Sequence, residues 1–401
     1  MSTVPTLHLK HGHLKPLLAG HPWVFATAVE RIEGDVKPGD ELCVRGPDGR
    51  AFGHGYYSPS SAIALRLLTQ GEEPADDTLL FKRLESAYAW RQTLLSAPMS
   101  EATTAYRLVN SEGDGLGGLI VDVYGPVVCV QFGTVGMHRR KAVIVAALEK
   151  LLKPSAIIDK SDGRVAKLEG LPAPTGEVFS GTAPSAAVEV RECGLSVHVE
   201  IGPGRGQKTG LYLDQRENRR RFAQFARGKE VLDLFAHVGL FSLHAARGGA
   251  KNLTLCDSSE PALQAAQANL ERNGVGDADL CLAEWPDAMR DLREKGRRFD
   301  LAAVDPPKFA TTRDDVSRAL GAYKDVNAQV ARLLKPGAIL FTCSCSSSVS
   351  AEDFERAVAA GLAQAGRRGM LLEARGAGSD HPVPPGFAQG RYLKCLILRV
   401  D

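Results

Sequence analysis

The stretch Val231-Leu-Asp-Leu-Phe-Ala-His-Val-Gly239 decides the fold, because a short apolar strand runs through a polar turn to a glycine before a helix begins near Leu240. The pattern of strand and then helix repeats downstream. Short apolar strands are expected at 231–235, 252–256, 280–283, 301–304 and 338–342, with helical patterns such as 261–273 and 323–334 between them. This alternation predicts an α/β domain with a doubly wound, mostly parallel sheet. Ligands of such sheets bind beyond the carboxyl ends of the strands.

The chain upstream of this domain has a different character. Residues 1–70 alternate short apolar runs with turn signals, which predicts a small β-barrel-like module. Residues 75–98 have the spacing of one amphipathic linking helix, and 105–200 indicate a small α+β region with strands at 119–124 and 127–132 and a helix at 141–152. We therefore expect three domains, at 1–72, 73–190 and 191–401.

Composition narrows the class of protein. With 401 residues, 44% hydrophobic and 24% charged, the chain is typical of a soluble protein with more than one domain. The net charge of +2 shows no global attraction to nucleic acid. No apolar run reaches the ~18–20 residues that span a bilayer, and the N-terminus lacks a signal-peptide pattern. These features predict a cytoplasmic protein with no membrane partner; the oligomeric state is undetermined, and a homodimer is one candidate.

Polar residues follow successive strands of the predicted sheet. Asp233 and Gly239 belong to the first turn, Asp257 ends the second strand, and Glu284 follows the third. A carboxylate in the position of Asp257 can accept hydrogen bonds from a ribose diol, and Phe235 or Trp285 could cover an adenine face. Each carboxylate alone could equally be a helix N-cap or a solvated loop residue. Their recurrence at successive strand ends favours a nucleoside cofactor, and the glycine spacing does not match Gly-x-Gly-x-x-Gly.

The fourth strand is followed by Asp305-Pro-Pro-Lys-Phe309. Two prolines fix the backbone and remove donors, so Pro306, Pro307, Lys308 and Phe309 could form a rigid rim that holds a flipped-out base facing Asp305. The alternative is a plain strand-terminating turn.

The fifth strand ends in Leu340-Phe-Thr-Cys-Ser-Cys-Ser346. Cys343 and Cys345 lie two residues apart, so both would point the same way in a continuing strand, and the period cannot separate them where the strand ends. We interpret this strand end as the position of a nucleophilic thiol beside a cofactor pocket. The other cysteines read as buried, reduced thiols, and the ten histidines form no ligand-spaced cluster with the cysteines, so no metal is expected.

Several segments, spread over nearly the whole chain, resemble the sequence motifs of a known family. They are 106–115, 206–216, 231–235, Asp257, 299–309, Tyr323-Lys-Asp325 and Phe341-Thr-Cys-Ser-Cys-Ser346. The chain resembles the S-adenosylmethionine-dependent cytosine-5 methyltransferases that act on large-subunit (23S) ribosomal RNA, in the bacterial subgroup with an N-terminal PUA domain. The resemblance implies a PUA β-barrel, a central α+β domain and a Rossmann-like methyltransferase domain.

The resemblance also implies roles for residues. Asp233, Gly239, Asp257, Glu284 and Asp305 would line the S-adenosylmethionine pocket. Tyr212 and Gln215 are further pocket candidates. Cys345 falls on the position of the nucleophile, whereas Cys343 would be a packing or auxiliary thiol.

The chemistry explains the need for a thiol, because carbon 5 of cytosine becomes nucleophilic only after a thiolate adds to carbon 6. A nearby cation such as Lys308 would favour the thiolate. The proline motif lacks the extra cysteine of the other large group of these enzymes, so Asp305 is the candidate for removing the carbon-5 proton. In the PUA-like module, His21, Arg45 and Arg66 are candidate RNA contacts, and Trp23 is expected to plug the barrel core.

Three alternatives remain at this stage. A methyltransferase of the same fold could modify a purine nitrogen, with Cys345 structural. A small-molecule or protein methyltransferase would leave the N-terminal module without a purpose. A non-catalytic RNA-binding protein could use the fold for assembly.

Overall fold

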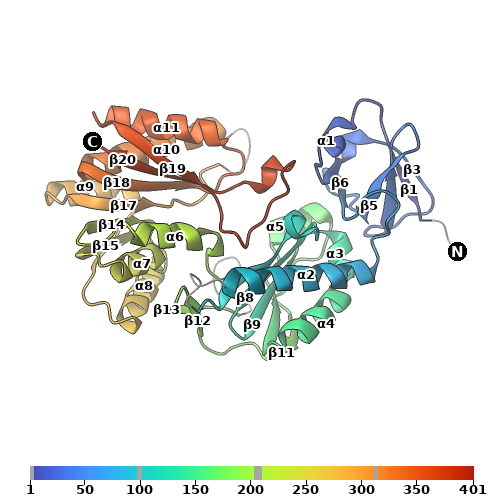
Figure 1. The fold of residues 1–401 in the computed structure, drawn as a ribbon, viewed down its shortest axis with the longest axis horizontal. Coiled ribbons are helices and arrows are strands. Elements are labelled where there is room, and N and C mark those ends of the chain that lie inside the picture. The colour runs from blue at the N-terminus through green and yellow to red at the C-terminus, as the bar shows by residue number, and fades with distance from the viewer. Residues whose placement is uncertain (1–3, 97–101, 203–209, 311–314) are drawn as a thin grey trace. The chain divides into compact units, whose positions relative to one another are not determined.

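The computed structural model describes residues 4–96, 102–202, 210–310 and 315–401. The chain forms two compact units, each with its own sheets and core (Figure 1). The first unit contains Met1–Glu192, Val199–Leu213 and Ser379–Gly390, and the second contains Cys193–His198, Asp214–Gly378 and Arg391–Asp401. None of the described helices is both long and apolar enough to cross a membrane.

A six-stranded sheet opens the first unit, in the order β2-β6-β5-β4-β1-β3. Its strands are β1 (Thr6–Leu9), β2 (Trp23–Phe25), β3 (Val29–Glu33), β4 (Glu41–Arg45), β5 (Ala51–Tyr57) and β6 (Ile63–Leu67), with short helices α1 (Lys15–Leu18) and η1 (Ala26–Ala28). β1 and β4 are parallel, and the other pairs are antiparallel. Alternate apolar residues such as Leu7, Leu9, Leu42 and Val44 fill its core.

A five-stranded sheet of order β11-β10-β9-β8-β7 completes the first unit. Its strands are β7 (Ala105–Asn110), β8 (Leu119–Tyr124), β9 (Val127–Phe132), β10 (Ala156–Asp159) and β11 (Val178–Gly181). Its helices are α2 (Asp77–Ser96), η2 (Ser111–Asp114), α3 (Val135–Arg139), α4 (Lys141–Leu152) and α5 (Gly163–Glu169). Leu80, Leu84 and Ala87 form the buried stripe of α2, as the helical spacing predicts.

The second unit is built on a seven-stranded sheet of order β16-β15-β14-β17-β18-β20-β19. The strands are β14 (Glu230–Leu234), β15 (Asn252–Asp257), β16 (Asp279–Leu282), β17 (Phe299–Val304), β18 (Leu334–Ser344), β19 (Gly369–Arg375) and β20 (Lys394–Val400). The first five run parallel, and β20 pairs antiparallel with both β18 and β19. The chain crosses from one unit to the other at β12 (Val188–Glu192), β13 (Leu195–Val199) and η3 (Leu213–Gln215). The short helix η4 (Ala388–Gly390) precedes β20.

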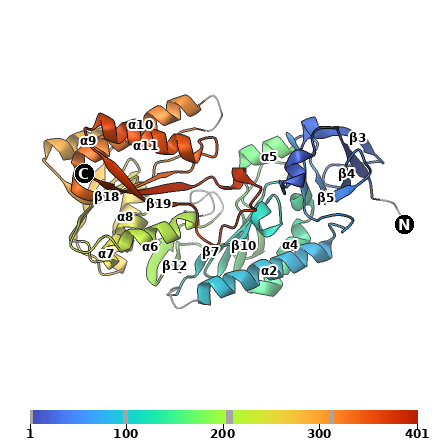
Figure 2. The same cartoon turned by 45° about the horizontal axis from the view of Figure 1, so that its top comes forward.

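Helices cover both faces of this sheet (Figures 1 and 2). One group is α6 (Arg216–Ala223), α7 (Leu240–Arg247) and α8 (Glu260–Arg272), and the other is α9 (Trp285–Glu294), α10 (Val316–Leu333) and α11 (Ala351–Gln364). Ser259 and Ser350 cap α8 and α11 by accepting backbone N–H bonds, as expected for serine at these positions. The doubly wound α/β architecture predicted from the strand–helix alternation is confirmed.

Candidate active site

Three carboxylates lie at the carboxyl ends of neighbouring parallel strands. Asp233 lies in β14, Asp257 ends β15, and Asp305 directly follows β17; β14 pairs with both of the other strands. Burial raises the pKa of Asp233 to about 7; hydrogen bonds from Ser242 oppose that rise, and the charges of Asp305 and Asp257 add to it. The fold therefore gathers these three predicted residues at one edge of the sheet.

The turn between β14 and α7 is held in an unusual backbone conformation. Phe235, His237 and Gly239 have φ values of 67°, 48° and 76°, all in the left-handed region. Such strain in non-glycine residues concentrates at functional sites. A Cβ on Gly239 would lie 2.8 Å from the Cβ of Ala266 in α8, so close helix packing requires the glycine.

Asp233 stabilises this turn from within the protein. Its Oδ2 accepts hydrogen bonds from the backbone N of Ser242 at 2.9 Å and from Oγ of Ser242 at 2.8 Å. Because Ser242 lies in the first turn of α7, the buried carboxylate ties the end of β14 to the start of that helix. Asp233 thus positions the loop that would face a cofactor.

Asp257 and Glu284 occupy the next two strand ends. Asp257 is half-buried and accepts hydrogen bonds from the backbone N of His237 at 2.8 Å and of Ser259 at 2.9 Å. Each carboxylate oxygen accepts one of these bonds and retains capacity for another. Glu284 is exposed at the N-cap of α9, where its side chain makes no capping bond. Neither carboxylate serves as a side-chain cap of the helix that follows it.

The end of β18 separates the two candidate thiols. Cys343 lies inside the strand, is 1% exposed, and faces Cys395 across the β18–β20 pair. Its hydrogen bond with Cys395, together with burial, raises the pKa of the Cys343 thiol well above its usual value. Cys345 lies just beyond the last strand residue, Ser344, and is partly exposed. Of the two, only Cys345 is accessible to a substrate.

A buried lysine holds the loop that carries Cys345. Nζ of Lys394 donates to the carbonyl oxygens of Ser346 at 2.6 Å, Val349 at 2.9 Å and Tyr392 at 3.0 Å. Burial lowers the pKa of Lys394 to about 8, although the negative charge of Cys345 opposes that change. The ammonium group is thus held against the backbone of the loop that carries Cys345, and a positive charge in such a position favours a thiolate.

Tyr323 of α10 links the thiol to the proline motif. Its hydroxyl is 3.3 Å from Oγ of Ser346, and its ring packs 4.9 Å from that of Phe309. Burial raises the pKa of Tyr323, and the charges of Cys345 and Asp305 contribute to the rise. Through these two contacts, Tyr323 connects the proline motif to the segment that follows β18.

The remaining candidates vary in exposure. Pro306 is buried, Pro307 and Lys308 are exposed, and Phe309 is half-buried. Gln215 is buried beside the start of α6; its Oε1 accepts from Asn218 at 2.7 Å, and its side chain also lies against the thiol of Cys343.

Tyr212 is half-buried in the first unit. The neighbouring segment 206–209, part of the family resemblance, lies outside the described residues.

Sequence reasoning gave no role to Lys394 or Tyr323. Tyr323 was part of the family resemblance, as Tyr323-Lys-Asp325. Lys394 had a weaker signal, a charged residue that opens the apolar strand Lys394-Cys-Leu-Ile-Leu. Its contacts depend on β20 inserting between β18 and β19, which no local pattern indicates.

The candidate RNA contacts of the N-terminal module are engaged within the first unit. Arg66 forms ion pairs with Glu169 at 3.3 Å and Glu112 at 3.4 Å, and His21 is buried. The indole of Trp23 donates to Glu112 at 2.7 Å, and Trp23 lies outside the cluster that fills the sheet core. The expected core plug was therefore wrong, and Arg66 and His21 have little free surface.

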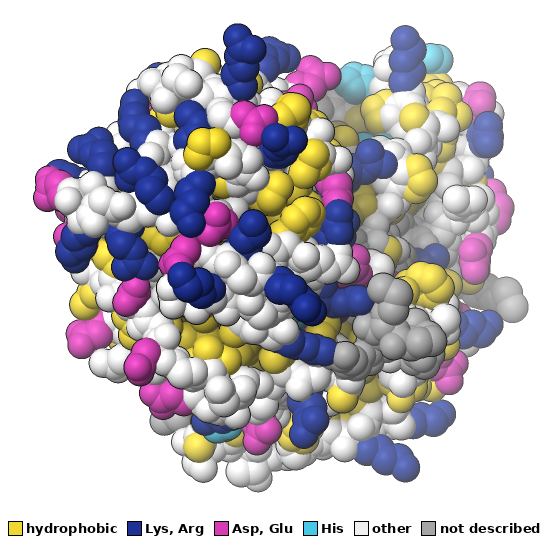
Figure 3. Space-filling model, turned by 60° about the vertical axis from the view of Figure 1, so that its left-hand side comes forward, with side chains coloured by type: hydrophobic (Ala, Val, Ile, Leu, Met, Phe, Trp, Pro, Cys, Tyr) yellow, Lys and Arg dark blue, Asp and Glu magenta, His cyan; other side chains and the backbone are white. Residues whose placement is uncertain are grey.

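Basic side chains are numerous on one face of the second unit. Figure 3 shows lysine and arginine side chains spread over the part of this unit that is turned forward, with fewer acidic ones among them. A local surface of this kind can attract a polyanion although the net charge of the whole chain is only +2.

Comparisons with known proteins agree with this geometry. Residues 7–70 match a PUA-like domain, and 122–365 match the family described as S-adenosylmethionine-dependent methyltransferase. The chain is 37% identical to ribosomal RNA large subunit methyltransferase I of Aeromonas salmonicida, over 98% of both chains. It is also 37% identical to the protein of that name from Shewanella amazonensis, over 98% of this chain and 99% of the other.

Two solved structures share the whole fold. SMU.776, described as a methyltransferase complexed with SAH, superposes with a TM-score of 0.84 at 22% identity, over 99% of this chain and 100% of the other. A SAM-dependent methyltransferase from Streptococcus mutans gives a TM-score of 0.82 at 20% identity, with the same coverage.

Proposed function

Because the chain belongs to the S-adenosylmethionine-dependent methyltransferases, here joined to a PUA-like domain, we propose that it methylates carbon 5 of a cytosine in large-subunit (23S) ribosomal RNA, with Cys345 as the nucleophile. The full-length relatives, named as large-subunit ribosomal RNA methyltransferases, support the substrate. The observation that carries the mechanism is a partly exposed Cys345 just beyond β18, in a loop whose backbone accepts hydrogen bonds from buried Lys394; the neighbouring parallel strand β17 is followed by Asp305.

The residues at the carboxyl edge suit a nucleoside cofactor. Asp257 would accept hydrogen bonds from the ribose hydroxyls, Glu284 would lie along the adenine edge, and Phe235 would cover the ring. Gln215 is buried next to Cys343 near the end of β18, so its amide could also contribute to this pocket. Asp233 and Gly239 would shape the loop, and Tyr212 remains a pocket residue that the family resemblance predicts. When bound, S-adenosylmethionine supplies a methyl carbon that is electrophilic because it is attached to a sulfonium.

The thiolate of Cys345 begins the reaction by forming a bond from Sγ to carbon 6 of cytosine. Electron density moves to carbon 5, which would then take the methyl group; the bond between sulfur and methyl would break, its electron pair would leave with S-adenosylhomocysteine, and carbon 5 would still carry its hydrogen. A base removes that proton, the bond between Sγ and carbon 6 breaks, and the thiolate is regenerated. Asp305 is our candidate for this base, since it directly follows β17, the parallel neighbour of the strand β18 that leads to Cys345.

The proline motif would hold the base. Pro306 and Pro307 make the backbone after β17 rigid, Phe309 is fixed against Tyr323, and the exposed Lys308 is available to a phosphate or to the cytosine carbonyl. RNA folded around the target would contact the PUA-like domain by shape and backbone. The domain limits at 72 and 190, the cytoplasmic location and a homodimer remain predictions.

The experiment is methyl transfer from labelled S-adenosylmethionine to unmodified large-subunit ribosomal RNA, followed by digestion to nucleosides. Wild-type protein should yield labelled 5-methylcytidine. Cys345→Ala should yield none, whereas Cys343→Ala, a matched loss of the thiol two residues away, should retain activity.

A labelled purine would replace this proposal with the nitrogen-methyltransferase alternative. Undiminished activity of Cys345→Ala would remove the covalent mechanism. Absence of S-adenosylmethionine binding would favour a non-catalytic RNA-binding protein.

A further inference from the structure

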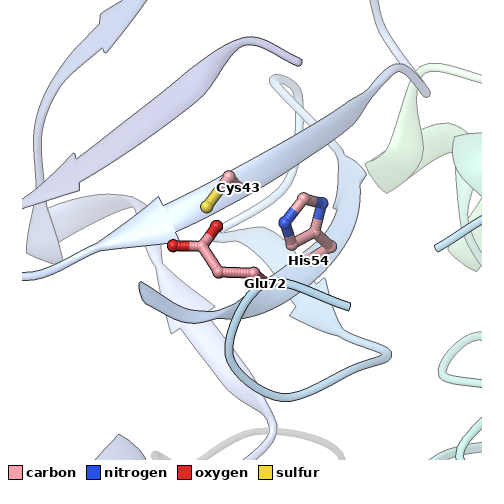
Figure 4. Close-up of side chains that lie close together, drawn as sticks. All are labelled: Cys43, His54 and Glu72. Atoms are coloured by element: carbon pink, nitrogen blue, oxygen red, sulfur yellow. The ribbon is translucent and has the colours of Figure 1, made fainter. Parts of the chain in front are cut away.

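A buried thiol, a buried imidazole and a carboxylate converge in the first unit, and the proposed methyl transfer uses none of them. Cys43 lies in β4, His54 lies in β5, and Glu72 follows β6. One potential ligand atom from each side chain lies within 4.8 Å of the other two. Figure 4 shows the sulfur, one ring nitrogen and the carboxylate turned toward a common point.

The strand register brings Cys43 and His54 together. They are direct partners across the antiparallel β4–β5 pair, so their side chains share one face of the sheet. Leu42 and Val44, on either side of Cys43, point into the hydrophobic core on the other face. The thiol and the imidazole therefore lie on the opposite face of the sheet, outside that core.

Glycines beside His54 allow the next segment to close over it. A Cβ on Gly53 would lie 2.1 Å from the carbonyl oxygen of Thr69, and one on Gly55 would lie 2.0 Å from that of Arg66. Because neither has a side chain, the chain that leads to Glu72 packs directly against β5. This packing places the carboxylate of Glu72 close to Cys43 and His54.

Hydrogen bonds fix the imidazole with one nitrogen unsatisfied. Nδ1 of His54 is 2.7 Å from Oε1 of Glu41, which also accepts the backbone N–H of Ala75 at 2.8 Å. A carboxylate partner makes Nδ1 the protonated nitrogen and leaves a lone pair on Nε2. That atom has no partner among the described residues, although the side chain is only 7% exposed. A histidine held by a carboxylate through one nitrogen is the usual arrangement of a metal ligand.

We propose that Sγ of Cys43, Nε2 of His54 and one carboxylate oxygen of Glu72 bind a zinc ion, with water in the fourth position. Thiolate, imidazole and carboxylate together are a zinc ligand set. Ligand atoms of a tetrahedral zinc site lie roughly 3–4 Å apart, so small side-chain movements close the present spacing. Arg45 binds Oε2 of Glu72 at 2.9 Å and leaves the other oxygen to the ion.

The ion would join β4, β5 and the segment after β6, and would therefore stabilise the N-terminal sheet. Binding requires the thiol to lose its proton. Zinc and the proton compete for Sγ, so zinc affinity should fall as the pH is lowered.

The test uses the full chain after removal of metals with a chelator. Zinc is titrated in competition with a chromophoric chelator, and Co²⁺ is added separately to report thiolate ligation by its charge-transfer absorption. The variants are Cys43→Ser and Glu72→Gln, the second of which changes an exposed side chain and should leave folding intact. The controls are Cys281→Ser, which removes a partly exposed thiol of the second unit, and Glu73→Gln, which changes the exposed neighbour of Glu72.

We expect one zinc ion per chain in wild-type protein and in both controls. Cys43→Ser should lose the cobalt–thiolate absorption, and Glu72→Gln should weaken zinc binding roughly tenfold or more. The proposal is overturned by wild-type protein that binds no zinc, by cobalt absorption that survives Cys43→Ser or disappears in Cys281→Ser, or by equal zinc affinities of Glu72→Gln and Glu73→Gln.

Discussion

Replacement of Lys394 by methionine should impair both the stability of the protein and its catalysis. The change keeps the length of the side chain and removes the ammonium group that donates to three carbonyl oxygens around Cys345. It also removes the buried positive charge beside the loop that carries Cys345. The loop after β18 would then lose its main internal support.

The structure sets the size of the effect. Each carbonyl left without a donor in a buried site costs about 1–3 kcal/mol. This loss is offset in part, because methionine carries no charge that must be buried. Burial lowers the pKa of Lys394 from 10.5 to about 8, so burying the charged group costs about 3 kcal/mol in the wild-type protein. We expect a net decrease of about 3 kcal/mol in the free energy of unfolding, and a fall in kcat of roughly 10–100-fold from the misplaced nucleophile.

Chemical denaturation would measure the first effect, and single-turnover methyl transfer the second. Arg399→Met is the matched control, because it removes an exposed cation from the same strand, β20. Binding of S-adenosylhomocysteine should change little in either variant. If Lys394→Met kept wild-type kcat and stability, the argument that this lysine positions Cys345 would be refuted.

Three further predictions concern the loops at the carboxyl edge. The pKa of Asp233 is about 7 in the folded protein and ordinarily 3.8. Between these two values the folded protein keeps the proton on Asp233, whereas the unfolded chain has released it. Stability should fall by up to about 4 kcal/mol as the pH rises from about 4 to 7, and thermal melts of Asp233→Asn should lack that slope. Asp257→Asn should weaken S-adenosylhomocysteine binding roughly tenfold by calorimetry; unchanged affinity would exclude the ribose contact. Gly239→Ala should cost about 2 kcal/mol in denaturant titrations, since the new Cβ would meet Ala266 at a φ of 76°; a neutral result would contradict the packing argument.

The fold was largely readable from the sequence, because the alternation of strand and helix is a local pattern. The five expected parallel strands correspond to β14 to β18. The insertion of β20 between β18 and β19 could not be foreseen, since antiparallel pairing of distant segments leaves no periodic signal. Trp23 was misjudged for a similar reason: its partner Glu112 lies 89 residues away.

The candidate site was predictable where residues lie at the carboxyl end of a strand, as Asp257 at the end of β15 and Asp305 after β17 do. The choice between Cys343 and Cys345 depended on where β18 ends, and strand boundaries are the least certain part of sequence reasoning. Lys394 reaches Ser346 only through the sheet order, and Cys43 meets His54 only through the β4–β5 register. Both contacts are tertiary, so residue spacing did not reveal them.

The most direct test of the central claim is covalent capture of RNA. Large-subunit RNA that contains 5-fluorocytidine would be incubated with the protein and S-adenosylmethionine, and the fluorine would block the final loss of a proton from carbon 5. The account predicts a complex that survives denaturation, with the RNA attached to the peptide that contains Cys345, and no complex with Cys345→Ala. A complex attached through Cys343, or methylation of unsubstituted RNA without any trapped complex, would contradict it.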